Sequence, residues 1–103
     1  MTYADILRRA ATLLEREGWC RCTTLYHRDA RNGEGAIWEA AGVHEPPFYR
    51  ECVETAKHVC NLADRHLRNR GLGHLSAYEA RPETTAADVI TALRAAAEEH
   101  DHT

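Results

Sequence analysis

Residues 47–70 read Pro47-Phe-Tyr-Arg-Glu-Cys-Val-Glu-Thr-Ala-Lys-His-Val-Cys-Asn-Leu-Ala-Asp-Arg-His-Leu-Arg-Asn-Arg70, the longest run of the chain without an internal Gly or Pro. An apolar residue recurs along this run at helical spacing, and such a stripe is typical of an amphipathic helix that covers a core. The prolines before it favour a helix start and Gly71 favours its end. The stripe consists of Phe48, Cys52, Ala56, Val59, Cys60, Ala63 and Leu67.

The two ends of the chain carry similar helical patterns. Residues 2–17 and 85–99 each place Ala, Ile and Leu on one face, joined by Val89 in the second segment, and Gly18 ends the first. Both segments begin with a Thr and an Asp at the spacing of a capping box, in which each side chain accepts the other residue's backbone N–H. The pairs are Thr2 with Asp5 and Thr85 with Asp88.

The segments between these helices are shorter and less regular. Residues 20–34 combine a mildly strand-like run with turn residues, so a hairpin arm or an ordered loop is expected. Residues 35–41 predict a short helix, and residues 75–82 a loop that fixes Leu75 and Tyr78 to the core. The fold class predicted is therefore all-α: one domain over 1–103, a compact bundle of three main helices plus one short helix, with a frayed tail at 100–103.

Length and charge exclude several classes of protein. A chain of 103 residues has room for one modest core, and a net charge of −3 argues against a dedicated nucleic-acid binder. Asp5, Arg8 and Arg9 interrupt the apolar core that a signal peptide needs, and no apolar run has the length of a membrane span. We therefore expect a cytoplasmic protein with reduced cysteines and no membrane contact.

Three motifs together resemble a known family. They are Leu-x-x-Ala-x-x-Leu-Leu-x-x-x-Gly-Trp from Leu7 to Trp19, Gly-Ala-Ile-x-x-Ala-Ala-Gly at 35–42, and an aromatic loop followed by Thr and Asp-Val-Ile-x-x-Leu-x-x-Ala-Ala between Tyr78 and Ala96. The chain is similar to a family of small uncharacterised domains of actinobacteria and their phages. The resemblance implies a helical domain from such a source, and it implies no activity.

Cysteine and histidine raise the question of a metal site. Cys20, Cys22 and His27 could be ligands, but a structural zinc site usually combines a wider Cys-x₂₋₄-Cys spacing with a second such pair. Cys52 and Cys60 lie eight positions apart on the long helix, too far to share one ion. We interpret that pair as core residues and expect no cofactor, which leaves zinc or thiol sensing at Cys20 and Cys22 as a minor alternative.

The sequence contains few signs of catalysis. Glu54 and His58 can touch at helical spacing, which is most often a solvated surface contact. The chain has no Gly-x-Ser-x-Gly, Walker-type or Gly-x-Gly-x-x-Gly motif. We therefore expect a protein that is not an enzyme.

A cluster of arginines supports a second alternative, a nucleic-acid-binding regulator. Arg65, Arg68 and Arg70 lie at the end of the long predicted helix. Cations at this position also complement the helix dipole, so nucleic-acid binding remains the weaker interpretation.

The preferred hypothesis is a small regulatory module that binds another protein or a second copy of itself. Aromatic residues and Arg are enriched at the centres of protein interfaces, and this chain has many for a core of its size. The segment around residues 20–34 is the predicted contact surface, with Trp38 behind it. Its candidate binding residues are Leu25, Tyr26, Arg28, Arg31 and Trp38.

Overall fold

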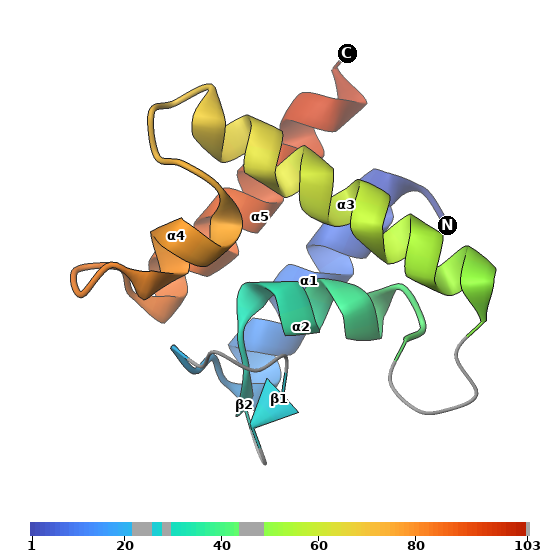
Figure 1. The fold of residues 1–103 in the computed structure, drawn as a ribbon, viewed down its shortest axis with the longest axis horizontal. Helices are drawn as coiled ribbons and strands as arrows, with labels where there is room; N and C mark the ends of the chain where they lie inside the picture. The colour runs from blue at the N-terminus through green and yellow to red at the C-terminus, as the bar shows by residue number, and fades with distance from the viewer. Residues whose placement is uncertain (22–25, 28–29, 44–48, 103) are drawn as a thin grey trace.

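The computed structural model describes residues 1–21, 26–27, 30–43 and 49–102. These residues form five helices, and the overall extents are 36 × 33 × 21 Å (Figure 1). The helices are α1 (Tyr3–Glu17), α2 (Gly33–Ala40), α3 (Arg50–Arg68), α4 (Leu75–Ala80) and α5 (Ala86–Asp101). A short antiparallel ladder joins the two-residue strands β1 (Tyr26–His27) and β2 (Ala30–Arg31), with Tyr26 opposite Arg31. The all-helical prediction is therefore confirmed at the level of fold class.

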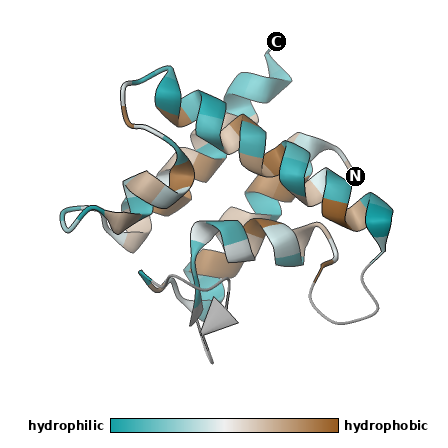
Figure 2. Ribbon diagram, viewed as in Figure 1, coloured by the Kyte–Doolittle hydropathy of each residue, from teal (hydrophilic) through white to brown (hydrophobic). Residues whose placement is uncertain are grey.

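Helix α1 lies at the centre of the packing. It contacts α5 most extensively and α2 next, while α3 crosses over α5, α2 and α1 (Figure 1). The apolar faces turn toward this centre and the polar faces turn outward (Figure 2). The largest fully buried side chains come from all five helices: Leu7, Leu14, Ile37, Val59, Leu67, Leu75, Val89 and Leu93. Many of the other core residues are alanines, which let the helix axes approach closely.

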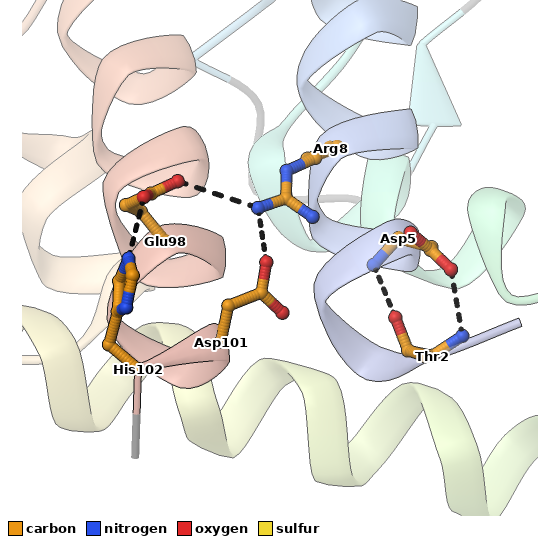
Figure 3. Close-up of polar contacts among 6 residues, drawn as sticks. All are labelled: Thr2, Asp5, Arg8, Glu98, Asp101 and His102. Atoms are coloured by element: carbon orange, nitrogen blue, oxygen red, sulfur yellow. Dashed lines mark hydrogen bonds and ion pairs between the residues drawn. The ribbon is translucent and has the colours of Figure 1, made fainter.

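Both predicted capping boxes are present. The Thr2 side chain accepts the backbone N–H of Asp5, whose carboxylate accepts the N–H of Thr2 (Figure 3). Thr85 and Asp88 make the same reciprocal pair at the start of α5. Each box satisfies two backbone donors that a helix start would otherwise leave without partners.

The long helix is shorter than the sequence predicted. It runs from Arg50 to Arg68, and Gly71 follows with φ +71, a backbone conformation that favours glycine. Its apolar stripe is buried at Ala56, Val59, Ala63 and Leu67, whereas Cys52 and Cys60 are half-buried. Phe48 and the two prolines fall outside the described residues.

The loop predicted at 75–82 is wrong over its first six residues, which form α4. The His74 side chain accepts the backbone N–H of Ala77 and so caps this helix, a role that His rarely signals in a sequence. Leu75 is fully buried and Tyr78 packs partly against the core, as expected. Within the described residues, no helix is long and apolar enough to cross a lipid bilayer.

The first and last helices are joined at their polar edge by ion pairs. Arg8 on α1 reaches both Asp101 and Glu98 on α5, and Glu98 also pairs with His102 (Figure 3). These side chains are largely exposed, so water and salt screen the ion pairs and each contributes little to stability. The cluster connects the edges of α1 and α5.

Replacing Thr85 with Ala should destabilise the domain by about 1 kcal/mol, because the backbone N–H of Asp88 loses its acceptor. The free energy of unfolding in urea, monitored by circular dichroism, measures this loss. Thr91→Ala, at an exposed mid-helix position on α5, is the matched control and should change stability by no more than a few tenths of a kcal/mol. Equal stability of the two variants would mean that the box does not hold the start of α5.

Candidate functional site

A buried carboxylate connects three segments that are far apart in the sequence. Glu79 on α4 is only 5% exposed. Its Oε2 accepts the indole N–H of Trp19 and the backbone N–H of Gly33, each at 2.6 Å. Gly33 is the first residue of α2, so the carboxylate lies at the positive end of that helix dipole. Glu79 therefore fixes the start of α2 and the residue that follows α1 against α4.

Arg21 extends this connection toward α5. Its Nε donates to the carbonyl of Glu79, and its Nη2 donates to the carbonyls of Pro82 and Thr84. The guanidinium also lies 5.3 Å from the centre of the Trp19 ring, in cation–π contact. The beginning of the 20–34 segment is thus bonded to the α4–α5 connection.

Burial changes the acid–base properties of this region. Desolvation raises the pKa of Glu79, and the hydrogen bonds from Trp19 and Gly33 oppose that change. On α3, burial raises the pKa of the Cys60 thiol to about 12, with Glu34 and Asp64 nearby adding to the effect. A thiol with this pKa stays protonated at neutral pH and is a poor nucleophile or metal ligand. These observations agree with a structural role for Cys60.

The prediction that all four cysteines are reduced is wrong for Cys20, which is disulfide-bonded. A sulfur in a disulfide is not available as a thiolate ligand. Cys22 lies outside the described residues, as does the side chain of His27. In the part of the chain that the structure describes, no three Cys, His, Asp or Glu residues are grouped so that they could hold a metal ion.

The arginines at the end of α3 differ in their surroundings. Arg65 and Arg68 are exposed, and no carboxylate among the described residues pairs with them. Arg70 instead pairs with Glu99 on α5 at 2.9 Å and donates to the carbonyl of His66. The His66 ring, 5% exposed, is bonded to the same Glu99 carboxylate at 2.6 Å. The predicted cluster therefore presents two uncompensated charges rather than three.

The predicted protein-contact residues are only partly visible. Leu25 and Arg28 fall outside the described residues, as does the side chain of Tyr26. The Arg31 side chain is 12% exposed, and its Nε lies 2.7 Å from Glu39 Oε2 and its Nη1 3.7 Å from Glu17 Oε2. Trp38 is half-buried and bonded to the Cys60 thiol. The Arg31 charge is thus engaged within the chain.

The described residues form a groove beside α1 that has both polar and apolar lining. One hollow of about 330 Å³ is lined by Met1, Arg9, Leu13, Glu39, Ala40, Ala41 and Gly42. A second, of about 410 Å³, is lined by Arg9, Thr12, Leu13, Arg16 and Glu17. Because Arg9 and Leu13 line both, we treat the two hollows together and call them the α1–α2 groove, although the described lining of the second comes from α1 alone. Met1, at one end, is 72% exposed.

Sequence reasoning did not find Glu79, Gly33 or Arg21, nor the α1–α2 groove. A Glu in an irregular segment predicts a solvated side chain, and only the burial of Leu75 and the tertiary contact with Trp19 make Glu79 an interior residue. The groove depends on the angle between α1 and α2, which no local pattern specifies. The only available signal was Leu13, an apolar residue at the margin of the stripe on α1.

Replacing Glu79 with Ala should destabilise the domain by on the order of 1–3 kcal/mol for each donor left without an acceptor, that is, for the Trp19 indole and the Gly33 amide. Urea denaturation followed by Trp fluorescence measures the loss and also reports the Trp19 environment. Glu79→Gln, which retains one oxygen in the position of Oε2, is the matched control and should lose less. If Glu79→Ala is as stable as Glu79→Gln, the hydrogen bonds from Trp19 and Gly33 do not stabilise the fold.

The same pair of proteins tests the sign of the pKa change. Because the pKa of Glu79 is raised from its ordinary value of 4.5, folding favours the protonated form. The stability that this preference contributes is present below pH 4.5 and is lost as pH rises through the folded-state pKa. The free energy of unfolding of the wild type should therefore fall relative to that of Glu79→Gln as pH rises above 4.5. A difference between the two proteins that does not change with pH would contradict a raised pKa of Glu79.

Retention on heparin tests the arginine cluster. We expect weak, salt-sensitive binding that decreases in the Arg65→Ala/Arg68→Ala variant and changes little in Arg70→Ala, because Glu99 already neutralises Arg70. The salt concentration at elution is the measurement. Tight retention that is lost in Arg70→Ala would show instead that Arg70 is the main heparin contact.

Comparison with known proteins adds one finding about identity. No curated protein and no solved structure matches the chain. A protein family described as "Family of unknown function (DUF6197)" matches residues 1–99, which include all of α1 through α4 and nearly all of α5. The match thus takes in the Trp19–Glu79–Gly33 connection and the α1–α2 groove, and this chain belongs to that family of unknown function.

Proposed function

We propose that the chain is a non-catalytic module that binds a segment of another protein in the α1–α2 groove. The observation that carries this proposal is the groove itself, an apolar surface beside the exposed Met1. Apolar grooves between helices are a common seat for a partner's amphipathic segment. The setting we propose is a small accessory or regulatory protein of an actinobacterium or its phage, which rests on the sequence resemblance alone.

The contacts of the neighbouring charged groups also favour binding over catalysis. Two carboxylate–imidazole pairs that could act as acid–base pairs are engaged with each other away from the groove: Glu98 with His102 at the surface, and Glu99 with the buried His66. None of these pairs lines the α1–α2 groove. The groove therefore suits binding: its described lining contains charged side chains (Arg9, Arg16, Glu17 and Glu39) but neither of these carboxylate–imidazole pairs.

The proposal predicts that Leu13→Gln abolishes partner binding. The substitution places a polar amide in the middle of the groove, where a partner's apolar side chain would have to cover it. The tagged chain is produced in its source cells, and retained proteins are quantified by mass spectrometry for wild type, Leu13→Gln and Thr91→Gln. The last variant changes an exposed position of α5 outside the groove and should retain what the wild type retains.

Two further measurements complete the test. Thermal melting by circular dichroism must show that Leu13→Gln is folded at the temperature of the experiment, because Leu13 also packs partly on the core. Native mass spectrometry of the purified chain over a range of concentrations identifies self-association, in which case the retained protein is a second copy. A partner held equally by all three variants would show that binding uses another surface.

A further inference from the structure

The α1–α2 groove has a regular arrangement of charge along one side. Arg9 and Arg16 lie seven positions apart on α1, which is two helical turns, or about 10.5 Å. Leu13 lies between them and is half-buried, and all three residues line the groove. The groove thus presents an apolar centre with a guanidinium at each end of its α1 side.

These two arginines, like Arg65 and Arg68, lack the carboxylate partner that several other arginines have. Arg8 pairs with Asp101, Arg94 with Glu15 and Arg70 with Glu99. No described carboxylate lies within ion-pairing distance of Arg9 or Arg16, although Arg9 does donate to the Met1 sulfur.

The groove also contains two carboxylates, and both are directed at an interior cation. Glu39 and Glu17 lie 2.7 Å and 3.7 Å from the guanidinium of Arg31, whose side chain is 12% exposed. Their charge is therefore partly offset from below. The single Arg31 charge offsets one of these two carboxylates, so the groove with Arg31 keeps a net positive charge, which Arg9 and Arg16 present on its α1 side.

We infer that the groove takes an acidic amphipathic helix of another protein, with two carboxylates about two turns apart on either side of an apolar side chain. In this arrangement each carboxylate meets one guanidinium while the apolar side chain covers Leu13 and Ala41. Two turns of the partner helix match the Arg9–Arg16 spacing without distortion. This inference rests on the proposed function, because it assigns the chemistry of the partner in that same groove.

The lining residues favour a protein partner over nucleic acid. Single-stranded nucleic acid binds through phosphate contacts together with stacking of bases on aromatic side chains. Among the described residues, none that lines the α1–α2 groove is Trp, Tyr, Phe or His, whereas Leu13, Ala40, Ala41 and Met1 suit an aliphatic side chain. A second copy of the chain fits less well, since the exposed acids Glu51 and Glu54 on α3 are only three positions apart.

Two synthetic helices of about 15 residues, long enough to hold helical structure, test the inference. Both are Ala-rich with a central Leu; one carries Glu four residues before and three residues after this Leu, and the other carries Lys at the same positions. Fluorescence anisotropy measures their affinity for the wild type, for Arg9→Glu/Arg16→Glu and for Leu13→Gln. An unrelated fluorescent single-stranded oligonucleotide is the fourth probe.

We expect the wild type to bind the Glu peptide on the order of tenfold more tightly than the Lys peptide, as two exposed charge pairs allow. This preference should shrink as salt is added, and it should reverse in Arg9→Glu/Arg16→Glu. Leu13→Gln should weaken binding of both peptides. Reversal by the double variant is the decisive result, because a variant that merely unfolds would lose both peptides.

Three results would overturn the inference. In the first, the wild type binds both peptides equally and Leu13→Gln binds neither. The groove would then still bind protein, as the proposed function states, but it would not prefer an acidic helix. Failure of both peptides would exclude the acidic helix as the partner, and the capture experiment with Leu13→Gln would still decide whether the groove binds protein. In the third, the wild type binds the oligonucleotide more tightly than the Glu peptide, and Arg9→Glu/Arg16→Glu no longer binds the oligonucleotide. The two arginines would then be a nucleic-acid contact.

Discussion

The bonds to the Glu79 carboxylate determine how the irregular half of this chain is arranged. A buried carboxylate is costly unless donors surround it, and here the Trp19 indole and the first amide of α2 supply them. The close approach favours glycine at position 33, because a Cβ there would lie 3.0 Å from Glu79 Oε1 and the carboxylate would have to shift. The identities of Trp19, Gly33 and Glu79 thus depend on one another, although 60 positions separate the first from the last.

This connection reaches the α1–α2 groove through the position of α2. Glu79 fixes the beginning of α2, and at its other end Gly42 takes φ +96, with the Cys52 sulfur 3.4 Å from where a Cβ would lie. Arg31 joins Glu39 near the end of α2 to Glu17 at the end of α1. With both ends of α2 held, the groove has a defined width, and a preformed surface of this kind would lower the entropic cost of the binding we propose.

The regular elements were predictable and their mutual arrangement was not. The capping boxes at Thr2 and Thr85, and the stripes on α1 and α5, express local rules that hold in any context, and the structure reproduces them. Helix α4 was missed because its cap is a His and its length is only six residues. Glu79 and the groove were missed because both result from contacts between remote segments, for which a single sequence carries no periodic signal.

The pairing of the first helix with the last has a consequence for how the chain is made. Helix α1 contacts α5 more than any other element, and the bond between Arg8 and Asp101 spans 93 positions. During synthesis the apolar face of α1 therefore emerges long before the helix that covers it. The core cannot close until α5 itself has been synthesised, so the contacts that bury α1 are among the slow, long-range ones to form. Truncation within α5 would consequently remove the native state as a whole rather than one helix from it.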